Sequence, residues 1–198
     1  MDPRARRAHV LVPVDFSPTS GSALQRAAEW AGQTAGELDV VHVVERGSGD
    51  AAGAVAALPH FLAMLERHAD KQLAGLCGAD GRPVVVHHHV AIGETSAEIL
   101  RLADRLSTEL IVMGATGSGG AKHSLGAVAR NIANSASCAV VVVAEGEGDD
   151  PSRATIMGQP LRDGTLAAAT RLGCGLAPAR SMAESRAKLP PKAGGDRS

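Results

Sequence analysis

Apolar residues follow two alternating patterns between residues 9 and 144. Short unbroken runs of Val, Leu and Ile are typical of parallel strands that are buried on both faces. Longer stretches between them repeat apolar residues about every 3.6 positions, as expected for helices with one buried face. These patterns predict strands at residues 9–14, 38–44, 83–92, 109–113 and 138–144, and helices at residues 19–36, 53–76, 95–106 and 125–136.

Residue types at the predicted helix ends support this assignment. Thr19 and Ser20 are suitable N-cap residues for the first helix, which Gly32 or Gly36 can end. Residues 95–98 read Thr-Ser-Ala-Glu, which is a capping-box pattern at the start of the third helix. Strands that alternate with helices imply right-handed crossovers and a parallel sheet covered on both faces. We therefore expect a doubly wound α/β domain.

The two ends of the chain differ from this central region. Beyond residue 145, Gly, Asp, Pro, Arg and Ala dominate without a sustained apolar period, so few side chains can offset the entropy of ordering. We expect a flexible N-terminus at residues 1–8, one globular domain at residues 9–144 and a disordered tail at residues 145–198.

Composition excludes several classes of partner. The 198 residues carry a formal net charge of -1, so no bulk positive field attracts nucleic acid or an anionic membrane. No apolar run reaches the roughly 18–20 residues that a membrane span requires. The three cysteines lie far apart and form no CxxC pair, which is typical of reduced thiols in a cytosol. We therefore expect a cytoplasmic protein that binds neither nucleic acid nor membrane.

The sequence also indicates where a ligand would bind. In open α/β sheets, ligands bind beyond the carboxyl ends of the strands, where the strand order reverses. Residues 13–17, 42–45 and 114–120 follow the first, second and fourth predicted strands and are expected to meet there. The last segment is rich in glycine, whose backbone N–H groups can approach phosphate oxygens closely, although glycine also suits an ordinary strand-to-helix turn. A Walker A loop is excluded because Gly120 occupies the place of the required lysine.

The order of these segments resembles the universal stress protein family over residues 9–144. The resemblance is carried by Val-Pro-Val-Asp-Phe-Ser at residues 12–17, Val-His-Val at 41–43, Gly93, Val-Met-Gly-Ala-Thr-Gly at 112–117 and Leu-Gly-Ala-Val-Ala at 125–129. It implies a five-stranded parallel sheet of the flavodoxin-like or adenine nucleotide alpha hydrolase-like type, with strand order 3-2-1-4-5. It also implies a stress-response module that binds ATP or another adenine nucleotide and acts as a dimeric sensor or regulator.

The resemblance further implies roles for individual residues. Asp15 would bind the adenine or ribose side, with Val43 near the base. Backbone groups of three glycines would hold the phosphates, with Met113 and Thr116 beside them. The implied nucleotide-binding residues are Pro13, Val14, Asp15, Val43, Met113, Gly114, Thr116, Gly117, Gly126, Ala127 and Val128. An alternative is open for Asp15, because an aspartate that follows a strand often caps the next turn with its carboxylate.

The sequence departs from the pattern of ATP-binding members at two places. Those members have nine residues between the second and third glycines and then Ser or Thr, whereas eight residues separate Gly117 from Gly126 and Ala127 follows. The missing hydroxyl removes a charge-assisted hydrogen bond worth about 1.5–3 kcal/mol, while the backbone N–H groups of Ala127 and Val128 remain. The departures favour an interaction module without nucleotide, and the retained Asp15 and glycines favour a nucleotide sensor.

Enzymatic and metal chemistry have little support in the sequence. No Ser-His-Asp or Cys-His spacing argues for nucleophilic catalysis, and His123 is the single candidate base for slow ATP hydrolysis. Residues 87–89 are all histidine, and His87 and His89 lie on the same side of a strand. A metal site needs three or four ligands, and the spacing places no further ligand beside them. We therefore assign no catalytic residue and no metal site.

The last predicted strand indicates how the protein assembles. Ala139–Val143 reads as an apolar edge strand, which is an aggregation liability unless it is paired. The resemblance implies that this strand joins the same strand of a second copy across a two-fold axis, which would satisfy both edges at once. We therefore expect a homodimer through Ala139–Val143 and, in addition, an unidentified regulatory protein partner.

Overall fold

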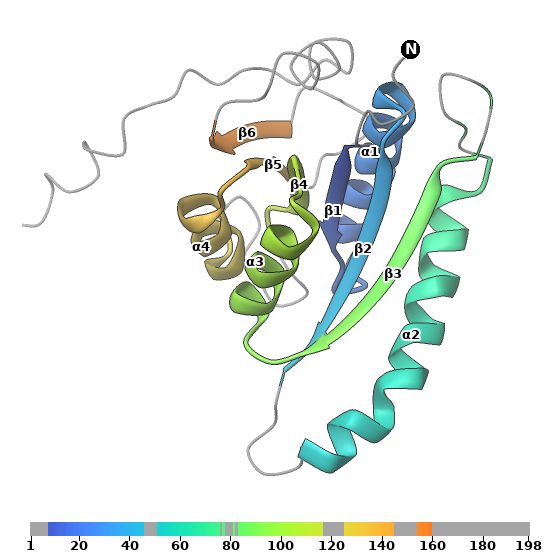
Figure 1. Cartoon of the computed structure of the whole chain (residues 1–198), viewed down its shortest axis with the longest axis vertical. Helices are drawn as coiled ribbons and strands as arrows, with labels where there is room; N and C mark the ends of the chain where they lie inside the picture. The colour runs from blue at the N-terminus through green and yellow to red at the C-terminus, as the bar shows by residue number, and fades with distance from the viewer. Residues whose placement is uncertain are drawn as a thin grey trace, which may run out of the picture.

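A single mixed sheet organises the molecule. The computed structural model describes residues 8–45, 51–75, 77, 81, 83–116, 125–144 and 154–159. The strands are β1 (His9–Pro13), β2 (Glu37–Val44), β3 (Val85–Ile92), β4 (Leu110–Gly114), β5 (Ala139–Val143) and β6 (Ala154–Gly158). They form one sheet in the order β3-β2-β1-β4-β5-β6, in which the first five are parallel, so the expected order 3-2-1-4-5 is confirmed (Figure 1).

Helices cover both faces of this sheet. They are α1 (Pro18–Thr34), α2 (Ala51–Leu73), α3 (Thr95–Leu106) and α4 (Ala127–Ser135). Figure 1 shows α3 and α4 together on one side of the sheet, with α1 behind it and α2 along β3. Within the strands, residues of opposite parity supply the two cores because successive side chains point to opposite faces. This arrangement confirms the doubly wound architecture.

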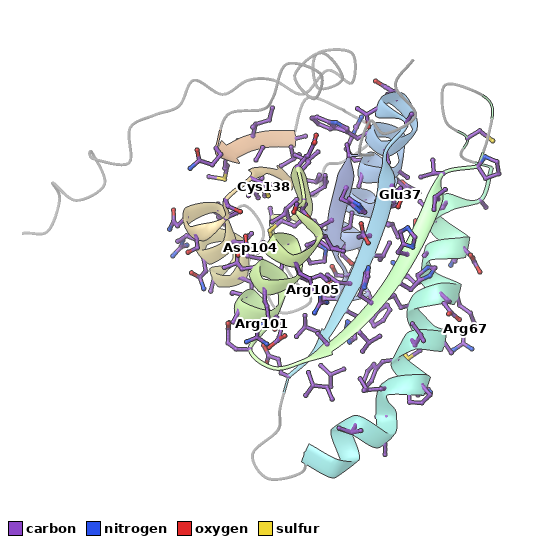
Figure 2. The ribbon with its side chains drawn as sticks, viewed as in Figure 1. Glu37, Arg67, Arg101, Asp104, Arg105 and Cys138 are labelled. Carbon is purple, nitrogen blue, oxygen red and sulfur yellow. The ribbon has the colours of Figure 1, made fainter. Side chains whose placement is uncertain are left out.

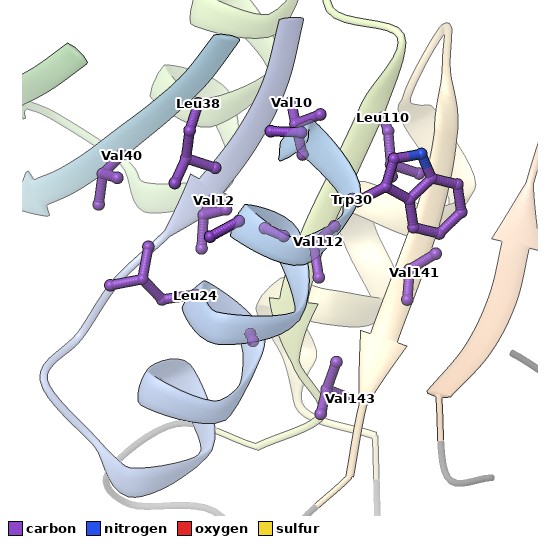
Figure 3. Close-up of a cluster of buried hydrophobic side chains, with 14 of the residues drawn as sticks. Val10, Val12, Leu24, Trp30, Leu38, Val40, Leu110, Val112, Val141 and Val143 are labelled. Atoms are coloured by element: carbon purple, nitrogen blue, oxygen red, sulfur yellow. The ribbon is translucent and has the colours of Figure 1, made fainter. Parts of the chain in front are cut away.

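The core on the α1 face is the larger of the two. Trp30 and Leu24 of α1 are fully buried and lie against strand residues such as Val12, Val112 and Val141 (Figure 3). Trp30 therefore anchors α1 to the sheet. The core on the opposite face is built around Leu11, Ile99, Ile111, Ile132 and Val140.

Two helix starts differ from the sequence expectation. Ser17 caps α1 by accepting a hydrogen bond from the Ser20 N–H at 3.2 Å, and Pro18 occupies the first turn, where its missing N–H costs nothing. Glu94 caps α3 and accepts from the N–H groups of Ser96 and Ala97 at 3.1 and 2.6 Å. Caps at Thr19 or Ser20 and a capping box starting at Thr95 were therefore wrong by one to three residues, because other oxygen-bearing side chains stood just before them.

Part of the expected disordered tail forms a strand. Residues Ala154–Gly158 pair antiparallel with β5, from Val143 opposite Ala154 to Ala139 opposite Gly158. The tail expectation is therefore wrong for these residues, and the sheet has six strands rather than five. The physical reason is that a five-residue strand gains its order from an existing sheet edge, which a periodicity within its own sequence cannot reveal. Because β6 pairs with the outer side of β5, β5 is not the edge strand that the sequence analysis expected.

Within the described residues, none of the helices combines the length and the apolar character that crossing a membrane demands. Cys77 is exposed and Cys138 is buried, and neither is in a disulfide. Burial, reinforced by the charge of Asp104, raises the pKa of Cys138 to about 11, so that its thiol is protonated at neutral pH (Figure 2).

Candidate functional site

A cavity of about 460 Å³ opens at the carboxyl ends of β1, β2 and β4. The strand order reverses between β1 and β4, so the cavity lies at the switch point where ligands of open α/β sheets bind. Its volume falls within the range of roughly 300–1,000 Å³ that is usual for small-molecule sites. The position and size of the cavity make it the candidate ligand site.

The predicted site residues converge on this cavity. Its lining includes Pro13, Val14, Asp15, Val43, Met113, Gly114, Thr116, Gly126, Ala127 and Val128. Gly117 and His123 lie outside the described residues. Segments that are far apart in the sequence thus meet around one space, as the carboxyl-end argument required.

Asp15 takes the turn-capping position that the sequence left open, and it also lines the cavity. Its Oδ1 accepts hydrogen bonds from the Ser17 N–H at 3.1 Å and from the Ser17 hydroxyl at 2.6 Å. Phe16, which lies between Asp15 and Ser17, has a φ of 63°, a left-handed conformation that is uncommon for a bulky residue. The bonds to Asp15 hold this turn and keep the carboxylate at the edge of the cavity.

His42 lies in the predicted segment 42–45 and lines the cavity, but the sequence analysis assigned it no role there. Its Nδ1 lies 2.8 Å from the Val14 carbonyl oxygen, which can only accept, so Nδ1 donates. The ring lies 4.7 Å from that of Phe16 and 5.2 Å from that of Phe61, measured between centroids. His42 therefore ties the loop that carries Asp15 to the end of β2. Its place directly before Val43 was the available signal.

His68 of α2 belongs to the same group of ring contacts as Phe16 and His42. Its ring meets that of Phe16 edge to face at a centroid distance of 5.5 Å. Burial and the nearby positive charge of Lys71 lower the pKa of His68, although the charge of Asp15 acts in the opposite direction. At neutral pH the ring is therefore uncharged and packs as an apolar group.

The start of α4 borders the cavity. Gly126 is the N-cap residue, and no side chain caps this helix. The Gly126 N–H donates to the Ala115 carbonyl oxygen at 2.7 Å, which fixes the position of the helix start. The first-turn residues Ala127 and Val128 line the cavity, and a helix N-terminus favours negative charge through its dipole. This end of the cavity is suited to an anionic group.

The two described glycines of the predicted motif have packing reasons as well. A Cβ atom at Gly114 would lie 3.0 Å from Thr19 Cγ2, so glycine allows α1 to pack closely against β4. A Cβ atom at Gly126 would lie 3.3 Å from the Ala115 carbonyl oxygen, which is tighter than usual. A side chain at either position would therefore crowd its neighbour.

Glu45 and Thr95 form another part of the rim that the sequence analysis did not assign. The Thr95 hydroxyl donates to Glu45 Oε1 at 2.7 Å, which links the end of β2 to the start of α3. Ser20 and Ile99 also line the cavity. The described lining thus carries two carboxylates, from Asp15 and Glu45, and neither lysine nor arginine.

A second group of titratable residues lies at the opposite, amino end of the sheet. Buried Asp39 pairs through its two carboxylate oxygens with His9 Nδ1 at 2.8 Å and His89 Nε2 at 2.7 Å. Burial alone would raise the pKa of Asp39, but the hydrogen bonds and charges of His89 and His9 outweigh it, so the pKa is lowered. His87 Nε2 lies 2.9 Å from Glu37 Oε2, and Figure 2 shows Glu37 on β2.

These contacts give the histidine run a structural explanation. His87 and His89 pair with carboxylates of the neighbouring strand, and His87 is exposed to solvent at the same time. Within the part of the chain that the structure describes, no group of three or more His, Cys, Asp and Glu residues is arranged to hold a metal ion.

Comparison with known proteins assigns the class of this domain. Residues 7–144 match the Universal stress protein family, and the chain belongs to this family. It is 35% identical over 138 residues to Universal stress protein A homolog 1 of Coxiella burnetii (strain RSA 493 / Nine Mile phase I), covering 68% of this chain and 94% of that protein.

Solved structures agree with the fold. Universal stress protein UspA from Lactobacillus plantarum matches with a TM-score of 0.54 and 24% identity, over 70% of this chain and 98% of its own. A universal stress protein in complex with cAMP matches with a TM-score of 0.53 and 22% identity, over 70% of this chain and 98% of its own. At these identities the matches show a shared fold.

Proposed function

We propose that this protein is a stress-response module that binds an adenine nucleotide in the cavity at the carboxyl ends of β1, β2 and β4. The observation that carries the proposal is the convergence of Asp15, Val43 and the first turn of α4 on one space of ligand size. They offer a carboxylate, an apolar side chain and a helix start, which suit the ribose, the base and the phosphates of a nucleotide in turn.

The lining supports one orientation of the nucleotide. Val43, Ile99 and Met113 provide apolar surface for a base, which gains free energy when its faces leave water. Asp15 offers carboxylate oxygens suited to ribose hydroxyls or the amino group of adenine, since both are donors. The uncapped start of α4 suits the phosphates. The similarly folded universal stress protein in complex with cAMP supports a nucleotide of this class.

Direct binding measurements test the proposal. Isothermal titration calorimetry with ATP, AMP and cAMP is expected to give saturable binding to the purified full chain. A Val43→Trp variant should abolish binding because the larger ring fills the cavity. Val85→Trp is the matched control, since Val85 lies at the amino end of β3 and is 42% exposed. Absence of binding by the wild-type protein at millimolar concentrations of all three nucleotides would overturn the proposal.

A second candidate is an interaction module that binds no nucleotide. It is favoured by Ala127 in place of the hydroxyl residue and by the two carboxylates of a lining that, as far as it is described, has neither lysine nor arginine. Like charges repel phosphate oxygens, which weakens binding of a highly charged ligand. Mass spectrometry of small molecules retained by the freshly purified protein separates the candidates, because only the first is expected to carry an adenine compound.

A further inference from the structure

The strand β6 occupies the edge of β5. All five residues of β5 are buried, and four of them are valine. The family match ends at residue 144, so β6 lies beyond the matched region. Without β6, the outer row of backbone N–H and C=O groups on β5 would be unpaired, and such an edge readily accepts another strand. The chain therefore covers the edge of β5 with a strand of its own.

β6 covers this edge on both faces of the sheet. Ala154 is 4% exposed, Ile156 packs against the core on the α1 face and Met157 against the core on the α3 and α4 face. Figure 1 shows β6 alongside β5, at the end of the sheet opposite β3. β6 is thus packed as part of the fold rather than held by backbone hydrogen bonds alone.

A second copy of β5 would need the same backbone groups. Two identical strands related by a two-fold axis pair antiparallel, and full overlap of Ala139–Val143 places Val141 opposite Val141 of the other copy. β6 also runs antiparallel to β5, with Ile156 opposite Val141. Because each N–H and C=O on this edge can serve one partner strand, β6 and a second β5 exclude each other.

We propose that β6 is an intramolecular cover that prevents β5 from pairing with the β5 of a second copy. While β6 is docked, two copies cannot pair through β5 and the protein stays monomeric. When β6 leaves, β5 joins two copies through a continuous sheet. The expected homodimer through Ala139–Val143 is therefore a property of the uncovered form.

Proline substitutions in the full chain test the release of the cover. In an antiparallel strand, alternate residues donate toward the partner, so one of two consecutive prolines must remove a ladder hydrogen bond. Thr155→Pro/Ile156→Pro should therefore detach β6, and sedimentation velocity at 5–100 µM should show a concentration-dependent dimer. The matched control Thr165→Pro/Leu166→Pro also replaces a threonine and the aliphatic residue after it, but outside β6, and like the wild type it should remain monomeric. A monomeric or aggregated β6 variant, or a dimeric wild type, would overturn the proposal.

Cysteine pairs identify the strands that meet. In a background with the native cysteines replaced, Val141→Cys/Ile156→Cys should form a disulfide within one chain, because directly opposed strand residues lie within disulfide reach. A non-reducing gel should then show a monomer. A disulfide between chains, or none, would contradict docking of β6 on its own β5. Adding Val141→Cys alone to the proline variant should cross-link two copies, whereas failure to cross-link would place the dimer contact elsewhere.

Discussion

The amino and carboxyl ends of the same sheet both gather titratable residues, but they use them differently. At the amino end, Asp39 is buried and its carboxylate is shared between His9 and His89. At the carboxyl end, Asp15 borders a cavity beside a helix whose first turn has no side-chain cap. The comparison shows that clustered charges alone do not define a site. A cavity of ligand size at the start of a helix without a side-chain cap distinguishes the carboxyl end.

The largest expected effect is a loss of stability at the amino end. Asp39→Asn should lower the free energy of unfolding by about 3 kcal/mol, because an amide cannot accept from both histidines and the buried group stays in place. Urea unfolding at pH 7 measures this loss, and nucleotide affinity should stay within about twofold of the wild type because the sites are distant. Glu37→Gln, in the more exposed pair with His87, should cost less than about 1 kcal/mol. Equal losses for the two variants would break the comparison.

The contribution of Asp39 should disappear in acid. Because its folded pKa is lowered, the ionised carboxylate stabilises the fold above the unfolded pKa of about 4, and this contribution is lost as pH falls through the folded value. The difference in unfolding free energy between wild type and Asp39→Asn should therefore be large at pH 5 and shrink below pH 4. Urea titrations at several pH values measure it, and a difference that grows in acid would contradict the assignment.

At the carboxyl end, the expected effect is on binding. Asp15→Ala should weaken adenine-nucleotide binding about tenfold, as expected for the loss of one charge-assisted hydrogen bond, and lower the unfolding free energy by less than about 1 kcal/mol. Calorimetric titration and urea unfolding measure the two quantities. Ser17→Ala is the control, since it removes the hydroxyl bond to Asp15 and the cap of α1 while leaving the cavity carboxylate. If Ser17→Ala weakens binding as much, Asp15 acts only through the turn.

The smallest expected effect concerns the start of α4. Ala127→Ser adds a hydroxyl beside the proposed phosphate position and should raise affinity for AMP about three- to tenfold, which corresponds to about 0.7–1.4 kcal/mol and is typical of one ordinary hydrogen bond. Adenosine, which has no phosphate, provides the comparison and should bind the two proteins equally in calorimetric titrations. An equal gain for adenosine and AMP would mean that the phosphate lies elsewhere.

Much of the fold follows from local patterns in the sequence. Burial determines which positions of a segment are apolar, and this pattern is visible in the sequence. It was sufficient to predict β1, β4, β5 and α3. The helix caps were less predictable because Ser17 and Glu94 compete with neighbouring residues of similar chemistry. β6 shows no such pattern, since its order depends on contact with β5.

The candidate site was predictable where a strand end determines position. Asp15, Val43 and Met113 follow or end three strands whose carboxyl ends must meet. The contact between Glu45 and Thr95 was not predicted because it depends on how α3 sits relative to β2. The link from His42 to Val14 was missed for a similar reason, since a side chain that bonds a distant carbonyl oxygen has no signature in sequence spacing.

The backbone of Ala115 makes contacts on both sides that bear on the length of the loop before α4. Its N–H donates to the Val143 carbonyl oxygen at 2.8 Å, and its carbonyl accepts from Gly126 at 2.7 Å. The segment after β4 and the segment before α4 are thus held together at Ala115. Shortening such a closed loop by one residue changes its closure entropy by only about 0.1 kcal/mol. We therefore expect a deletion between these anchors to leave the start of α4 in its place.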